Sequence, residues 1–143
     1  MSSILGETIF NKEGRVRLSE LDSLEFVLLF YFDPNSLTSA ILTPLMQNFY
    51  AKINYMRKKL EVVQLFKDVS PRQWLAFQSQ IPWCSLPPQS SRVEHLQRIR
   101  ERSPGKPVMI LLTTNGSIVS TNPGQDLLRM GVECYESWRS INV

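Results

Sequence analysis

The stretch FVLLFYFDPNSLTSAILTP, residues 26–44, predicts a strand, a tight turn and the start of a helix. Its first seven residues form an unbroken apolar run, rich in aromatics, which is typical of a strand buried on both faces. The turn Asp33-Pro34-Asn35 ends the strand, and Ser36 and Ser39 stand where the helix begins. Because serine hydroxyls accept hydrogen bonds from the free N–H groups of a first helical turn, this pair is interpreted first as a helix cap.

A long helix and a second buried strand follow. Over residues 39–59, apolar side chains recur at three- and four-residue intervals and form one helical face: Leu42, Leu45, Met46, Phe49, Ile53 and Met56. The apolar run Leu60–Phe66 predicts the second interior strand. Two strands joined through a helix are expected to pair in parallel, with a right-handed crossover.

Shorter elements complete the pattern. Residues 8–10 and 16–18 predict an opening hairpin, Ser70-Pro71 and Ser91 predict two helix N-termini, and residues 81–88 are interpreted as a connector. Asn115-Gly116 predicts a closing hairpin, and a last helix is expected from Asn122-Pro123. We therefore expect one domain over residues 1–143, an α/β fold with a central mixed β-sheet flanked by helices on both faces.

The composition is that of an ordinary globular chain of 143 residues, 43% hydrophobic and 20% charged, with a net charge of +3. No apolar run approaches the ~20 residues needed to cross a bilayer, and the N-terminus lacks a secretory signal. A cytoplasmic location, with access to the nucleus, is expected. Basic residues gather at Arg57-Lys58-Lys59, interpreted as the last turn of the long helix, and over residues 92–106. No RNA-binding aromatic signature accompanies them, so a nucleic-acid partner is not expected.

Metal and hydrolase chemistry find little support in the residues present. Cys84 and Cys134 are the two cysteines, they belong to no Cys-x-x-Cys pair, and His95 is the single histidine. A zinc site would lack ligands, and no Gly-x-Ser-x-Gly elbow accompanies the histidine. We expect neither a metal nor a cofactor.

Several segments, taken in order, resemble the tryparedoxin and nucleoredoxin-like branch of the thioredoxin-like proteins. They are LLFYF at residues 28–32, Thr43-Pro44, Phe49-Tyr50, LEVV at 60–63, PWCSLP at 82–87 and KPV at 106–108. The start ILGE at residues 4–7 and the tail positions Asn115-Gly116, Gly131, Cys134 and Trp138 resemble the nucleoredoxin-like group called rod-derived cone viability factors. The resemblance implies a thioredoxin-like fold and, where cysteines are present, a thiol reductase role. It also implies an association with the maintenance of photoreceptors and other sensory neurons.

The chain departs from that family at its decisive motif. Ser36 and Ser39 stand where the family carries Cys-x-x-Cys, Asn35 replaces a tryptophan, and the loop is one residue shorter. A cysteine at a helix N-terminus becomes a reactive thiolate at neutral pH, whereas a serine hydroxyl stays protonated and forms no reversible bridge. We therefore expect no catalytic residues of the dithiol kind, and interpret the chain as a module that binds an unidentified protein partner.

The resemblance also implies where such a partner binds. Pro107 takes the position of the cis-proline that faces the active site in this family, in a loop that receives extended substrate segments. The expected binding surface is Asn35, Ser36, Leu37, Trp83, Lys106 and Pro107, gathered at one end of the sheet.

The two cysteines leave alternatives open. Cys134 shares a helical face with Leu127 and Trp138 and is expected to be buried and inert. Cys84 is interpreted as a packed thiol, with a reactive surface thiol as the rival. In that case the protein would be an oxidoreductase or peroxide-reactive enzyme working through Cys84. A purely architectural subunit of a larger assembly is the third possibility.

Overall fold

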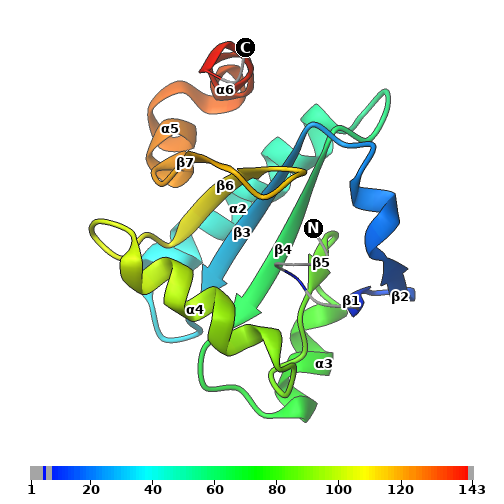
Figure 1. The fold of residues 1–143 in the computed structure, drawn as a ribbon. Coiled ribbons are helices and arrows are strands. Elements are labelled where there is room, and N and C mark those ends of the chain that lie inside the picture. The colour runs from blue at the N-terminus through cyan, green and yellow to red at the C-terminus, as the bar shows by residue number, and fades with distance from the viewer. Residues whose placement is uncertain (1–4, 6–7, 142–143) are drawn as a thin grey trace.

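The fold is built on two central parallel strands, as seen in a computed structural model that describes Leu5 and residues 8–141. Strand β3 (Phe26–Phe32) pairs with β4 (Leu60–Phe66), with Phe26 opposite Leu60 and Phe32 opposite Phe66. Helix α2 (Leu37–Ile53) makes the crossover between them (Figure 1). Both predicted interior strands and their parallel pairing are confirmed.

Antiparallel strands extend the sheet on both sides. Strand β6 (Met109–Thr113) pairs with β3, and β7 (Ile118–Ser120) returns beside β6 after the predicted turn, where Gly116 has a left-handed φ of 95°. On the other side, β5 (Cys84–Ser85) pairs with β4 and with β1 (Thr8–Asn11), which forms a hairpin with β2 (Gly14–Arg17). Across the described residues the sheet has seven strands in the order β2-β1-β5-β4-β3-β6-β7. Two residues are too few for a sequence pattern, so β5 was interpreted as part of a connector.

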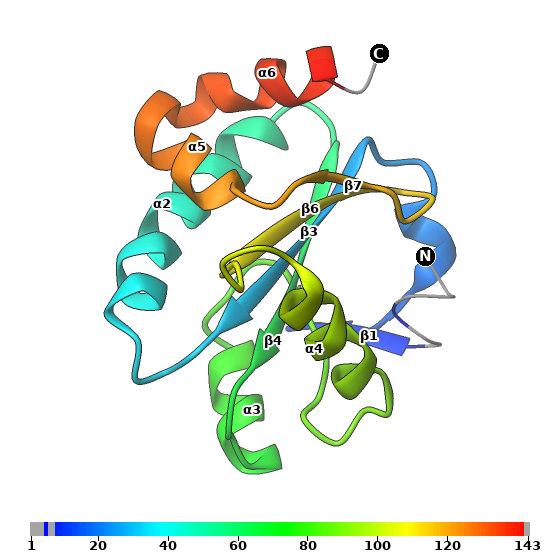
Figure 2. The same ribbon diagram turned by 60° about the vertical axis from the view of Figure 1, so that its left-hand side comes forward.

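Helices cover both faces of this mixed sheet. One face packs against α2, α3 (Pro71–Gln78), α5 (Pro123–Met130) and α6 (Cys134–Ile141). The other face packs against α4 (Arg92–Arg102) and the 3-10 turn η1 (Leu18–Leu21), and Figure 2 shows α4 across β3 and β4 from α2. Along β3, Phe26, Leu28 and Phe30 belong to the first core, while Val27, Leu29 and Tyr31 belong to the second. The expected α/β, thioredoxin-like fold is confirmed.

Helix α2 ends earlier than predicted. Its last residue is Ile53, and the side-chain oxygen of Asn54 accepts hydrogen bonds from the N–H groups of Lys59 (2.8 Å) and Leu60 (3.2 Å). The cations Arg57-Lys58-Lys59 therefore lie in a loop and not in a helical turn, and Met56 is exposed, so both predictions are wrong. The apolar periodicity of the sequence does not reveal this side-chain stop.

The structure also differs in part from the predicted helix N-termini and the predicted last helix. Ser70 forms a complete capping box with Gln73, as its position predicted, whereas Ser91 makes no side-chain cap bond. The expected last helix is broken into α5, the 3-10 turn η2 (Gly131–Glu133) and α6, because Gly131 adopts a left-handed φ of 62°.

Candidate functional site

The loop from β3 to α2 is held by hydrogen bonds among its own residues. The Asp33 carboxylate accepts from the Asn35 N–H (2.9 Å), and the Asp33 carbonyl accepts from the Ser36 N–H (3.0 Å). This pattern is a tight turn stabilised by a hydrogen bond to the aspartate side chain. It fixes the point at which α2 begins.

Ser36 is the N-cap of α2. Its backbone is extended (φ −96°, ψ 127°), and its Oγ accepts a hydrogen bond from the Ser39 N–H at 3.3 Å. Its carbonyl accepts from the Ala40 N–H at 3.1 Å, which is the first bond of the helix. The interpretation of Ser36 as a cap is confirmed, and such a cap stabilises a helix by about 1 kcal/mol.

Ser39 occupies the inner side of the same junction. It is buried, and its Oγ accepts a hydrogen bond from the Asp33 N–H at 3.1 Å. Its carbonyl accepts from the Thr43 hydroxyl at 2.7 Å. Ser39 therefore ties the first turn of α2 to the end of β3, while Ser36 lies at the surface edge of the same turn.

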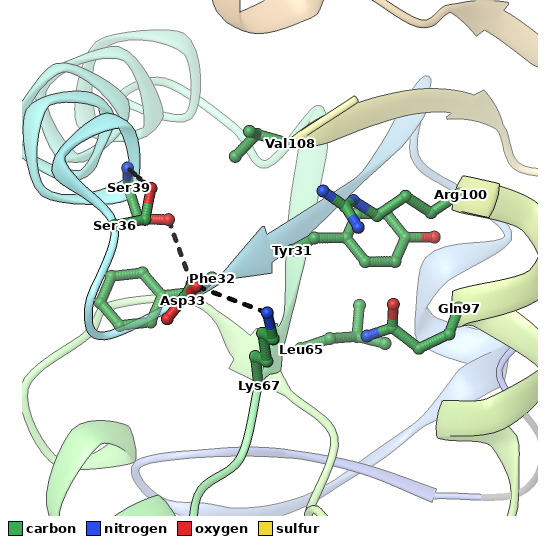
Figure 3. Close-up of a pocket in the computed structure, with 10 residues that line it drawn as sticks. All are labelled: Tyr31, Phe32, Asp33, Ser36, Ser39, Leu65, Lys67, Gln97, Arg100 and Val108. Carbon is green, nitrogen blue, oxygen red and sulfur yellow. Dashed lines mark hydrogen bonds and ion pairs between the residues drawn. The ribbon is translucent and has the colours of Figure 1, made fainter. Parts of the chain in front are cut away.

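The two serines border a cavity of about 110 Å³ at the end of the central strands (Figure 3). Its other walls come from β3, β4, α4 and the segment before β6: Tyr31, Phe32, Asp33, Leu65, Lys67, Gln97, Arg100 and Val108. The Lys67 ammonium lies 3.9 Å from the Asp33 carboxylate. Hydroxyls, one carboxylate and two cations thus meet at this cavity, and its described lining residues include no thiol.

Tyr31 and Arg100 connect this cavity to the neighbouring loop. The Tyr31 hydroxyl donates to the Leu96 carbonyl at 2.7 Å, and burial raises the pKa of Tyr31 well above its usual range, so the phenol stays protonated. The Arg100 guanidinium lies 5.9 Å from the centre of the Tyr31 ring, and its Nε–H donates to the Pro107 carbonyl at 2.9 Å. Arg100 thereby holds the Pro107 loop against α4.

Lys106 and Pro107 border a second cavity, of about 370 Å³, together with residues of α2 and α5. Val108 lines both cavities, so Ser36 and Pro107 border neighbouring spaces and not one shared space. The described residues contain no cis peptide bond, and Lys106 has a left-handed φ of 45°. Pro107 thus takes the position of the family's cis-proline, but the Lys106–Pro107 bond is trans in this structure.

The residues predicted to form the binding surface differ in how exposed they are. Asn35 and Lys106 are exposed, Pro107 is half-buried, and Leu37, the first residue of α2, is 75% exposed. Trp83 is fully buried, so its place on the binding surface is wrong.

Trp83 lies in the core because its polar atom finds a partner there. Its indole N–H donates to the Gln64 side chain at 2.7 Å, and its ring packs edge-on against Tyr50 at 5.7 Å between centres. A buried tryptophan is stable where its N–H is satisfied. The buried glutamine on β4 that satisfies it was not recognisable as a partner from the sequence.

Comparison with known proteins agrees with the fold. The thioredoxin-like family model matches residues 24–118, which run from just before β3 to the start of β7. The chain belongs to the thioredoxin-like family. No curated protein matches it by sequence.

Solved structures of tryparedoxins resemble this thioredoxin-like chain over almost its full length. Tryparedoxin from Trypanosoma brucei has a TM-score of 0.81 and 22% identity over 96% of both chains. Tryparedoxin I from Crithidia fasciculata has a TM-score of 0.78 and 22% identity over 92% of both. Tryparedoxin I from Leishmania major has a TM-score of 0.78 and 20% identity over 94% of this chain and 92% of its own. At these identities the likeness establishes the fold.

Cys84 of the thioredoxin-like chain is fully buried in β5. Its thiol donates to the Glu61 carboxylate at 3.1 Å, and that carboxylate also accepts from Lys58 (2.7 Å) and from the Tyr50 hydroxyl (2.6 Å). Burial, followed by the neighbouring Glu61 charge, raises the pKa of Cys84 far above its usual range. The rival interpretation of Cys84 as a reactive surface thiol is therefore wrong.

Cys134 is buried at the start of α6, beside Trp138, as predicted. Burial, and then the charge of Asp126, raises the pKa of Cys134 to about 12. Neither cysteine presents a thiolate at neutral pH.

The other polar residues that line the smaller cavity were not assigned to the site from the sequence: Tyr31, Asp33, Lys67, Gln97 and Arg100. Lys67 follows the carboxyl end of β4, and that position was a usable signal because parallel strands end at the same edge. The sequence places Tyr31 in the buried strand and Arg100 among the basic residues of 92–106, and neither position indicates a site residue. Among the described residues, no group of His, Cys, Asp and Glu could hold a metal ion, and none of the described helices is long and apolar enough to cross a membrane.

Proposed function

We propose that this thioredoxin-like chain does not catalyse dithiol–disulfide exchange and instead binds a protein partner at the end of the sheet where α2 begins. The observation that carries the proposal is the pair Ser36 and Ser39 at the N-cap and third residue of α2. Both hydroxyls accept backbone hydrogen bonds that hold the loop and the helix together.

The chemistry of the position supports the loss of catalysis. A thiol at the N-cap of a 17-residue helix faces free N–H groups and the positive end of the helix dipole, which lower its pKa. A hydroxyl there remains protonated at neutral pH and cannot form a reversible bond with a substrate sulfur. The two cysteines of the chain are buried away from this site. A single-thiol enzyme is not proposed, because Cys84 is both buried and hydrogen-bonded to a carboxylate.

The proposed binding surface consists of Asn35, Ser36, Leu37, Lys106 and Pro107. Leu37 supplies an exposed apolar side chain at the first helical residue, flanked by polar Asn35 and Ser36. The larger cavity behind Lys106 and Pro107 offers a recess for one side chain of the partner. An apolar contact with a polar rim is the usual composition of such an interface.

The resemblance to the nucleoredoxin-like group supports a finer proposal. We place the single-domain protein in the cytoplasm, with access to the nucleus, and assign it to the maintenance of photoreceptors or other sensory neurons. The test is removal of the protein from such cells: reduced survival is expected, and unchanged survival contradicts this part of the proposal.

Selection of peptides from a displayed library without cysteine tests the binding role. Peptides selected on the full chain are expected to bind the Leu37→Glu variant about tenfold more weakly or worse, because the apolar contact is lost. The matched control is Leu75→Glu, since Leu75 is also an exposed leucine, 62% accessible, on α3. Selected peptides that bind both variants equally, or no selected peptides at all, contradict the proposal.

A further inference from the structure

The loop that joins α2 to β4 exposes two large apolar side chains side by side. Tyr55 is 82% and Met56 is 86% exposed. The run of four residues from Tyr55 to Lys58 is exposed throughout. Figure 1 shows this loop beyond the end of the sheet that lies opposite the arrowheads of β3 and β4, and hence opposite the Ser36 site.

The loop has a fixed base. The Asn54 side chain, at the start of the loop, bonds to backbone groups at the end of the loop. Its Oδ1 accepts from the N–H groups of Lys59 (2.8 Å) and Leu60 (3.2 Å), and its Nδ2 donates to the Leu60 carbonyl (3.0 Å). The Tyr55 N–H donates to the Lys52 carbonyl at 3.4 Å. The apolar tip is therefore presented by an anchored turn, and its exposure is built into the fold.

Cations flank this apolar tip in the sequence. Residues 52–59, KINYMRKK, contain four cations and no carboxylate. The nearest acidic partners are set back: Glu61, which is buried and binds Lys58, and Glu25, which lies 3.9 Å from the exposed Arg57. The exposed residues of this stretch thus combine an apolar pair, Tyr55 and Met56, with three cations, Lys52, Arg57 and Lys58.

We propose that the α2–β4 loop docks this protein reversibly onto an anionic lipid surface. Tyr55 and Met56 enter the boundary between headgroups and acyl chains, while Lys52 and Arg57 lie at the level of the lipid phosphates. Tyrosine is enriched at exactly this depth of a bilayer edge, and juxtaposed cations add attraction to anionic lipids.

A narrow protruding tip favours lipid over an acidic protein surface. A specific protein interface buries about 800 Å² on each partner and needs a complementary shape. A lipid headgroup layer accepts a projecting apolar tip with no matching shape, and it supplies diffuse negative charge to the flanking cations. The surface lies away from the Ser36 end of the sheet, so both can be occupied together.

Cosedimentation of the full chain with vesicles tests the proposal. We expect binding to phosphatidylcholine vesicles that contain phosphatidylserine, weaker binding at high salt, and little binding to phosphatidylcholine alone. The variant Tyr55→Ser/Met56→Ser should bind about tenfold more weakly, because the inserted apolar area is lost. The matched control, Leu75→Ser/Ile118→Ser, removes two exposed apolar side chains elsewhere and should bind as the unsubstituted chain does.

A spectroscopic readout reports insertion directly. The native tryptophans are buried, so the indole introduced by Met56→Trp is the one that meets water. Its emission should shift to shorter wavelength with vesicles that contain phosphatidylserine. The proposal is overturned by absent binding to these vesicles, by equal loss in the control variant, or by loop-dependent binding to polyglutamate or RNA with none to vesicles.

Discussion

The α2 N-terminus and the buried core place similar side chains in opposite surroundings. Ser36 and Ser39 lie at a cavity that opens at the end of the sheet, whereas Cys84 and Cys134 are fully buried. The hydroxyls stand where a thiol would be activated, and the thiols stand where burial suppresses ionisation.

Cys134 shows how burial suppresses a thiol at the start of a helix. It is the first residue of α6, yet its pKa is raised to about 12, by burial and then by Asp126. The 3-10 turn η2 runs directly into α6, and the Cys134 N–H donates to carbonyls within that turn, so this position is not a free helix terminus. The comparison indicates that reactivity depends on a helix terminus that is also accessible, and this is the environment of Ser36.

Thiol labelling of the native chain gives the largest expected effect. Cys84 and Cys134 should react at least about 1000-fold more slowly than in the unfolded chain, because a reagent reaches them only after the structure opens. The measurement is the time course of labelling at neutral pH, with and without denaturant. Rapid labelling of Cys84 in the native chain would contradict its assignment as a buried, unreactive thiol.

The variant Ser36→Cys/Ser39→Cys places one thiol at the accessible position 36 and a second thiol at the buried position 39. The helix terminus should lower the pKa of the first thiol from ~8.5 toward ~7, which gives about tenfold more thiolate at pH 7. Disulfide reduction should then rise above the rate of the reductase system alone, the rate at which the unsubstituted chain is expected to stay. Recovery is expected to be partial because Asn35 stands in place of the family's tryptophan.

Mass analysis of the oxidised double variant is the control for that experiment. A folded variant that forms no disulfide between positions 36 and 39 would contradict the account. The backbone of the loop, and not only its chemistry, would then have diverged from the family.

Replacing each buried cysteine with serine tests how a hydroxyl is tolerated in the core. Cys134→Ser should lower the free energy of unfolding by about 1–3 kcal/mol, since a hydroxyl is placed among apolar side chains. Cys84→Ser should cost less than about 1 kcal/mol, because a hydroxyl can also donate to Glu61. Denaturant unfolding of both variants measures the difference, and the reverse order would contradict the assigned contacts.

Removal of the Ser36 cap has a smaller expected effect than the exchange at Cys134. Ser36→Ala should lower the free energy of unfolding by about 1 kcal/mol through the lost bond to the Ser39 N–H. Ser91→Ala is the matched control, because Ser91 occupies an N-cap position without a cap bond and should change stability little. Equal effects of the two substitutions would show that the Ser36 hydroxyl does not cap α2.

Local patterns predicted the centre of the fold well. The apolar runs Phe26–Phe32 and Leu60–Phe66 were each predicted as a buried strand, and both are. Asn115-Gly116 was predicted as a hairpin turn, and Gly116 adopts the left-handed φ that such a turn needs. Ser36 was placed as a cap by its position after Asp33-Pro34-Asn35. Each of these depends on neighbours in sequence.

The features that were missed depend on partners distant in sequence or on single side chains. The end of α2 is set by Asn54 reaching Lys59 and Leu60, against the apolar periodicity. Trp83 is buried because Gln64 satisfies it, and Arg100 joins the site through the Pro107 carbonyl. Gln64 and Trp83 lie 19 residues apart, and the nearer pairs follow no periodicity that predicts a helix or a strand.

Disulfide turnover by the unsubstituted full chain tests the central claim most directly. The rate of reduction of a protein disulfide, coupled to a thioredoxin reductase system, is compared with that of the Cys84→Ala/Cys134→Ala variant. The account predicts that both proteins give the rate of the reductase system alone. Turnover above that rate, lost in the variant without cysteines, would contradict it.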